Sequence, residues 1–229
     1  MKKTNYILKN QSTINVSFWA SNYIQNQAHT EKLKNIADTL DGIIDDLSKY
    51  GWYINANFSI NFILELANYV KQKNAKELEN EIIKYYKHNI DGIRKNLLIK
   101  YNDRQILLEE AFNAHKREMY FSSTILFLSQ ADGLCDGNFF LLAKNKKKLK
   151  TFLNQKQSPD VVNIVLGKES AIDSWTGHKQ KYFSDLNRHD IMHGYCFDFG
   201  NEVNSFKALS LLCFMSDFID SYNKFEKYK

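Results

Sequence analysis

The stretch NEVNSFKALSLLCFMSDFI, residues 201–219, places apolar side chains on more than one side of a helix. One series contains Val203, Phe206, Leu209, Leu212 and Cys213, and a second flank contains Phe214, Phe218 and Phe225. A helix that is apolar around much of its circumference is buried or lies at an oligomer interface. We therefore predict a helix from about Glu202 to Tyr228 that lies inside the protein or between two copies of it.

Helical spacing of apolar residues also dominates the sequence before this stretch. We predict helices over about 30–50, 58–70, 76–98, 104–135 and 179–192, and a loop over 155–177. Gly51 should end the first helix, Asp103 should cap the fourth, and Gly194 should end or kink the fifth. A single proline and nine glycines leave long stretches without a helix breaker. The fold class that follows is all-α.

The length of 229 residues allows one substantial core, or a core with a helical extension. Residues 1–100 are predicted to form a helical N-terminal region of unknown role. The pattern restarts near residue 101, so 101–229 should form a second helical domain, or both parts form one continuous globular unit. The hydrophobic fraction of 44% is typical of a globular protein and argues against a disordered one.

Charge and cysteine content limit the partners and the compartment. The net charge of +5 permits a polyanionic partner without requiring one. Cys135, Cys196 and Cys213 include no CxxC pair, so neither a disulfide framework nor a zinc ribbon is expected. The first residues lack the apolar region of a signal peptide, and no apolar run is long enough to span a bilayer. These features predict a soluble cytoplasmic protein.

Residues 187–194, NRHDIMHG, hold the chemistry most typical of an active site. Arg188 carries a permanent charge with a fork of donors that fits phosphate, and His189 and His193 can exchange protons near neutral pH. These groups suit metal-independent cleavage of a phosphodiester in RNA, with one imidazole as base and another as acid. On a helix, His189 and His193 share one face, whereas Arg188 and His193 lie about 140° apart. One copy of the chain therefore supplies only part of such a site.

Two other readings of the same residues stay open. Residues 189–193 have the spacing of the HExxH zinc motif, with Asp190 in place of the glutamate and Asp198 or Glu202 as a further ligand. In the structural reading, histidine caps the end of a helix and Arg188 pairs with an acid such as Asp190. Three consecutive lysines form either a solvated charged face, which we favour, or a surface for RNA: Lys146, Lys147 and Lys148.

The segment NRHDIMHG, together with the apolar helix after it, resembles the C-terminal signature of HEPN domains. The likeness is to the Apea-like or RiboL-PSP-associated kind found in phage and plasmid defence genes. These proteins share an arginine, a polar residue, several variable residues and a histidine, matched here by Arg188, His189 and His193. Residues 121–137, FSSTILFLSQADGLCDG, also resemble the earlier apolar helix of the family. The resemblance covers about residues 102–228.

The resemblance implies an all-α bundle of the HEPN type that dimerises so that two Arg–His pairs face one cleft. It implies a metal-independent endoribonuclease without a cofactor, used as a toxin or antiviral effector, with an antitoxin or regulatory partner. His193 would be the catalytic histidine, Arg188 would bind phosphate and His189 would orient them. We add Asp132 and Asp190 as supporting acids. Some members have lost activity, so a non-catalytic module that binds RNA or protein is the alternative, and the zinc hydrolase is third.

The dimer that this reading needs is expected to form through the apolar helix that starts near Glu202. That helix has more apolar surface than one face of a bundle requires, and it follows His193 closely in the chain. A twofold interface there would bring the second Arg–His pair to the first.

Overall fold

The computed structural model describes residues 42–44, 46–55, 57–134 and 186–227, with no account of the side chains beyond 220. Residues 42–49 are helical apart from 45, which is outside the described residues. The named elements are α3 (Ile60–Lys71), α4 (Ala75–Lys100), a 3-10 turn η1 (Asn102–Arg104), α5 (Gln105–Lys116), α6 (Tyr120–Gly133), α9 (Arg188–Met192) and α10 (Glu202–Lys227). The described residues contain no strand, so the predicted all-α class is confirmed for this part of the chain.

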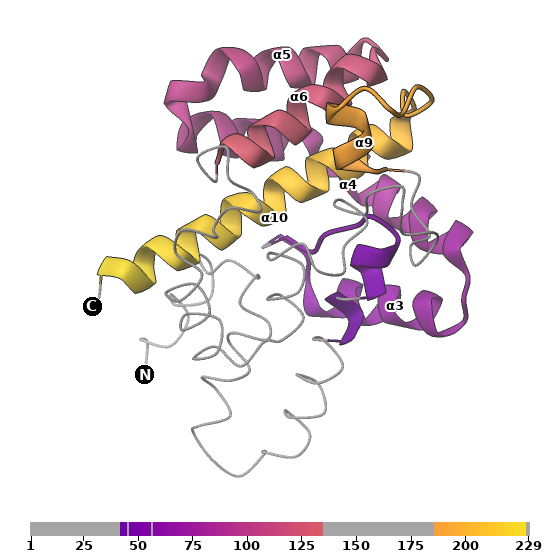
Figure 1. Cartoon of the computed structure of the whole chain (residues 1–229). Coiled ribbons are helices and arrows are strands. Elements are labelled where there is room, and N and C mark those ends of the chain that lie inside the picture. Colours follow the sequence, from indigo (N-terminus) through magenta and orange to yellow (C-terminus); the bar gives the residue numbers. More distant parts are fainter. Residues whose placement is uncertain (1–41, 45, 56, 135–185, 228–229) are drawn as a thin grey trace, which may run out of the picture.

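Helix α10 runs through the middle of the fold, with α5 and α6 on one side and α3 on the other (Figure 1). Every residue from Asn204 to Ser216 is buried. The predicted burial is therefore confirmed for residues 204–216, and the chain's own elements supply the cover. The expectation that this helix forms a dimer contact is wrong for residues 204–216, because they are not accessible to a second copy.

Two polar residues in the buried part of α10, Lys207 and Ser210, have partners on neighbouring elements. The ammonium of Lys207 lies 2.6 Å from a carboxylate oxygen of Glu79 and 5.6 Å from the ring centre of Trp52. The hydroxyl of Ser210 accepts from the backbone N–H of Tyr53 at 3.3 Å. A buried cation left without its partner costs roughly 3–5 kcal/mol. The pairing therefore fixes where α4 and the segment around Trp52 and Tyr53 lie.

The hydrophobic core does not divide at residue 100. Trp52 stacks on Tyr86 with ring centres 6.2 Å apart, and Tyr86 lies 5.8 Å from the ring of Phe206 on α10. Asn55 donates to the hydroxyl of Tyr86 at 2.8 Å, which gives this buried hydroxyl a partner. Cys213, which belongs to the apolar series expected for this helix, is buried in the same core. Residues on both sides of position 100 thus share one cluster of buried side chains.

Four of the described helices end in the same kind of turn, in which a residue just after the helix has a positive φ. Gly51 and Gly194 take this conformation at φ 81° and 75°, as glycine readily does. Lys73 and Glu118 take it at φ 54° and 60°, although a side chain disfavours it. After α5, the N–H of Met119 donates to the carbonyl of Ala114, and the N–H of Glu118 donates to a carbonyl in the last turn, which closes the turn.

The turn at Glu118 corrects the predicted continuous helix over 104–135. α5 ends at Lys116 and α6 begins at Tyr120, so the two helices fold back beside each other. No glycine or proline marks this break in the sequence, which explains why periodicity alone did not reveal it. Asp103 is not the N-cap either: it lies in η1, and α5 begins after Arg104. The Arg104 side chain instead donates to the carbonyl of Gly133 at 2.7 Å.

Within the described residues, the predicted helix over 179–192 is wrong at positions 186 and 187. Leu186 and Asn187 are not helical, and α9 begins at Arg188. Residues 179–185, the predicted loop over 155–177 and Cys135 lie outside the described residues. The predicted helices over 58–70, 76–98 and 202–228 are confirmed as α3, α4 and α10 with small shifts at their ends. Across the described ranges, no helix combines the length and apolar character that a membrane span requires.

Replacing Glu118 by glycine should stabilise the protein. An L-residue in the left-handed region costs roughly 1–2 kcal/mol, whereas glycine adopts it readily, so we expect the free energy of unfolding to rise by about 0.5–1 kcal/mol. Glu110 is the matched control, because it is exposed in the interior of α5. Glu110→Gly should lower the same quantity by about 1 kcal/mol. Urea unfolding of both variants gives the comparison, and equal destabilisation by both would contradict the left-handed turn.

Candidate functional site

The candidate site is built on α9, a helix of 5 residues that is held at both ends through Asp190. At its start, the Asn187 amide donates to the Asp190 carboxylate at 2.8 Å and its oxygen accepts from Asp190 N–H at 3.2 Å. At its end, Tyr195 N–H donates to the Asp190 carbonyl at 2.7 Å, and Gly194 N–H donates to Ile191 carbonyl at 3.1 Å. Such a short helix is not stable alone. These hydrogen bonds provide the stability that so short a helix lacks.

Arg188 is the first residue of α9 and points to α6. Its Nη2 lies 2.8 Å from Oδ2 of Asp132, and the two side chains are only 13% and 22% exposed. The structure therefore brings together two of the residues singled out from the sequence, Arg188 and the supporting acid Asp132. The carboxylate offsets the arginine charge and fixes the direction of the guanidinium. Arg188 pairs with Asp132 of a neighbouring helix, whereas the structural reading had named Asp190 for this role.

The two histidines lie side by side on the same short helix. The ring centres of His189 and His193 are 4.4 Å apart, as four-residue spacing predicts. His193 is the C-cap residue and is exposed, whereas Arg188 packs inward against α6. This difference in exposure agrees with the expectation that Arg188 and His193 point in different directions around the axis of α9. Tyr195 follows, with its ring centre 6.4 Å from that of His193.

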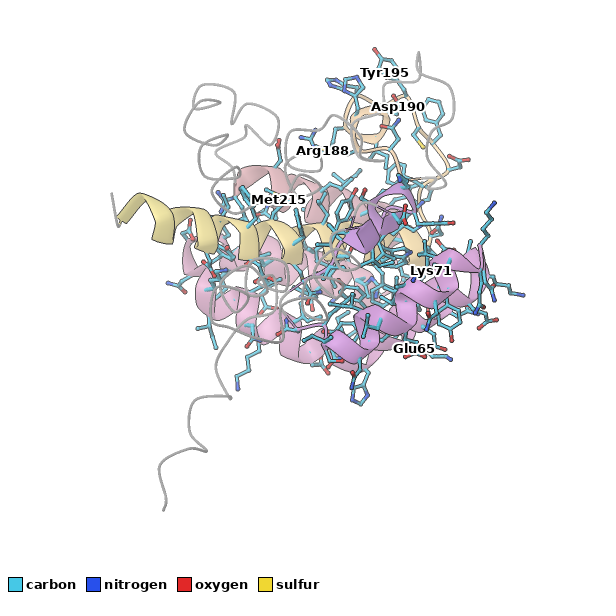
Figure 2. All side chains as sticks on the ribbon, turned by 90° about the horizontal axis from the view of Figure 1, so that it is seen from below. Glu65, Lys71, Arg188, Asp190, Tyr195 and Met215 are labelled. Atoms are coloured by element: carbon cyan, nitrogen blue, oxygen red, sulfur yellow. The ribbon has the colours of Figure 1, made fainter. Side chains whose placement is uncertain are left out.

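Asp190 is buried, with 5% of its surface exposed. One of its carboxylate oxygens accepts from Asn187, and the other has no hydrogen-bond partner among the described residues. It is therefore a positioning residue for α9 and is not exposed beside the histidines, where a general base of the HExxH type would stand. Figure 2 shows Arg188, Asp190 and Tyr195 on one side of the molecule, with Tyr195 furthest out.

The other acids named as possible metal ligands are engaged elsewhere. Glu202 pairs with Lys87 at 2.8 Å, and Asp198 accepts from the thiol of Cys196 at 3.3 Å. Burial raises the pKa of that Cys196 thiol, so the neutral form that donates this bond is favoured. Among the described residues, no three His, Cys, Asp or Glu side chains are grouped so that they could hold a metal ion.

Exposed apolar side chains beside His193 were not singled out from the sequence. Met192, Tyr195 and Phe197 are 41%, 67% and 80% exposed. The loop that carries them is fixed by Phe199, whose ring packs against Phe121 of α6 with centres 5.1 Å apart. In the sequence, the aromatic residues at every second position over 195–199 could have indicated this exposed apolar surface. They mark a segment of recurring aromatic side chains, of which Phe199 is buried and the other two are exposed.

One copy of this arrangement offers a charge for phosphate and two imidazoles for proton transfer. The imidazoles are next to each other, however, so they reach the same atom of a substrate more readily than two atoms on opposite sides of phosphorus. The lysines named for RNA, Lys146, Lys147 and Lys148, lie outside the described residues, and their role stays a prediction.

The comparisons with known proteins return no match among family models, curated proteins or solved structures. The resemblance over residues 102–228 therefore rests on the residues quoted for it alone.

Replacing Asn187 separates its two contributions to α9. Asn187→Ala removes both the cap and the donor to buried Asp190, which together should cost about 2–4 kcal/mol of local stability. Asn187→Ser keeps a hydroxyl that can cap the helix and removes only the amide donor, so its cost should be smaller. Hydrogen exchange at the N–H groups of Ile191 and His193 measures this directly. Equal protection in wild type and both variants would show that Asn187 does not hold the helix.

Proposed function

We propose that this chain is a metal-independent endoribonuclease of the HEPN type, acting through Arg188, His189 and His193. The observation that carries the proposal is the short helix α9, which presents two adjacent imidazoles and starts with an arginine fixed by Asp132. These are the residues to which the resemblance assigns phosphate binding, orientation and catalysis. The all-α fold around it is the class that such a protein requires.

The reaction uses the 2′-hydroxyl of the ribose before the scissile phosphate. A neutral imidazole, assigned to His193, takes the hydroxyl proton while the 2′-oxygen forms a bond to phosphorus. The bond from phosphorus to the 5′-oxygen breaks, and an imidazolium protonates that oxygen. The products are a 2′,3′-cyclic phosphate and a free 5′-hydroxyl. Arg188 stabilises the extra negative charge on the phosphate oxygens in the transition state.

Asp132 is assigned the role of a positioning residue for Arg188. A guanidinium has five N–H donors, so a carboxylate and a phosphate can bind different edges of the same group. The ion pair keeps the long side chain of Arg188 against α6 and limits the entropy lost when the phosphate binds. Asp190 acts one step further away, because it fixes the helix on which both histidines stand.

The second half of the site is assigned to a second copy of the chain. Acid and base are needed on opposite sides of the phosphorus, and the histidine pair of one copy lies on one side. The buried residues 204–216 of α10 are excluded as the contact, so the two copies would meet through the exposed residues around His193. Met192, Tyr195 and Phe197 offer apolar surface at that place.

A second candidate function is a non-catalytic module that binds RNA or protein. The ion pair between Arg188 and Asp132 favours it, because an arginine already neutralised by a carboxylate attracts phosphate less strongly. The zinc hydrolase based on His189 and His193 ranks third, since buried Asp190 is not placed to act as its base. A role as a toxin or antiviral effector, with an antitoxin or other regulator, follows from the resemblance and belongs to the first candidate.

Cleavage of RNA in excess chelator distinguishes the three functions. His193→Ala and Arg188→Ala should each lower the rate by about 10²–10⁴-fold, because each removes a group needed in the transition state. His88→Ala and Arg117→Ala are matched controls, since both residues are exposed and lie away from α9 in the chain. Both controls should cleave at the wild-type rate.

Each outcome of this series selects one function. Wild-type protein that binds RNA without cleaving it supports the binding module, and cleavage that stops when the chelator is added supports the zinc hydrolase. Cleavage that continues at full rate in both site variants would refute the assignment of Arg188 and His193.

Complementation tests whether the site is shared between two copies. Arg188→Ala and His193→Ala alone should each cleave about 10²–10⁴-fold more slowly than the wild type, but a mixture can form heterodimers in which one arginine and one histidine remain in the common cleft. We expect the mixture to recover part of the wild-type rate, after subunit exchange has been confirmed by mass spectrometry. A mixture that exchanges subunits yet stays inactive would contradict the composite site.

A further inference from the structure

A second site lies between α4, α5 and α10, away from α9. These helices enclose an open cavity of about 380 Å³, and none of its lining residues belongs to α9. This volume is within the range of about 300–1,000 Å³ that is usual for sites of small molecules. The function proposed for α9 does not use this cavity, so its role is a separate question.

Three cations stand around the cavity. Lys87 and Arg94 lie two turns apart on one face of α4, and Lys116 is at the end of α5. Lys87 pairs with Glu202 at 2.8 Å, and Arg94 pairs with Glu109. Lys116 is exposed and has no ion-pair partner among the described residues. An anionic group on a ligand would therefore find one uncompensated ammonium and two ordered cations within the same site.

The inner wall is apolar and aromatic. Phe112 and Phe206 are 4% and 1% exposed, and both contribute to the lining of the cavity. The imidazole of His115 lies against Phe206, with ring centres 4.4 Å apart. These buried rings give the cavity an apolar inner wall, and one ring nitrogen of His115 is a hydrogen-bonding group beside it.

His115 is held in place by a chain of buried hydroxyls. Its Nδ1 lies 2.8 Å from the hydroxyl of Ser205 on α10, which lies 2.6 Å from the hydroxyl of Ser123 on α6. Both serines are fully buried. The engaged Nδ1 leaves Nε2 as the nitrogen able to bond a molecule in the cavity. Burial lowers the pKa of His115, so the ring is neutral near pH 7 and carries a single N–H.

The lining also contains the carboxylates of Asp91 and Glu202. A simple anion would gain little from a site that carries both signs of charge. A molecule with a phosphate and an amino-bearing ring uses both, because its phosphate bonds the cations and its amino group donates to a carboxylate.

We propose that this cavity binds a mononucleotide, with its base beside His115 and its phosphate on the cations of the rim. His115 Nε2 bonds an edge of the base. The site is independent of RNA cleavage at α9, because it shares no residue with that site.

Binding of AMP, GMP, CMP and UMP to the full chain tests the proposal by calorimetry. At least one should bind saturably, and Lys116→Ala should weaken that binding about tenfold or more, as loss of a charge-assisted bond predicts. Lys95→Ala is the matched control, because Lys95 is exposed on α4 and does not line the cavity. It should bind as the wild type does. The imidazole signals of His115 should also shift on binding in NMR spectra.

Three results would overturn the proposal. They are the absence of saturable binding by all four nucleotides at millimolar concentration, equal binding by inorganic phosphate alone, and undiminished binding in Lys116→Ala. RNA cleavage by Lys116→Ala is measured in parallel and should match that of the wild type, so a failure of the cavity and a failure of the α9 site give different results.

Discussion

The burial of α10 from Asn204 to Ser216 is the constraint on which the rest of the structure depends. A helix that is covered on all sides needs neighbours around its whole circumference, and α4, α5, α6 and the segment around Trp52 and Tyr53 supply them. The polar side chains on α10 make the arrangement specific. Lys207 requires Glu79 of α4, and Ser205 requires His115 of α5. Hydrophobic contact would allow several packings, whereas buried polar groups without partners cost about 1–3 kcal/mol each.

The candidate site depends on this core in turn. A helix as short as α9 has no independent stability, so the positions of His189 and His193 are set by what α9 touches. Leu186 and Ile191 anchor it in the core, Arg188 binds Asp132 of α6, and Asp190 joins its two ends. On this buried support, His193 is exposed and Arg188 and His189 are half-buried. Changes in α6 near Asp132 should reach the histidines through the contact with Arg188.

The sequence allowed α3, α4 and α10 to be predicted because each is long and periodic. The turn at Glu118 was missed because a glutamate occupies a position where glycine is usual, so no residue type in the sequence indicated the end of a helix. The start of α9 was missed because the two hydrogen bonds between Asn187 and Asp190 override the apolar periodicity before it. Spacing correctly placed His189 beside His193. The contact of Arg188 with Asp132 joins positions 56 residues apart (188 − 132), and the cavity joins three helices, so neither follows from local pattern.

The central claim is that α9 cleaves RNA through attack by a ribose 2′-hydroxyl. The most direct measurement uses an RNA oligonucleotide cut in excess chelator, with mass spectrometry of the product ends. We expect a 2′,3′-cyclic phosphate and a 5′-hydroxyl, and no cut where the ribose before the scissile phosphate is replaced by 2′-deoxyribose. Cleavage at that deoxyribose, or products that end in a 5′-phosphate, would contradict it.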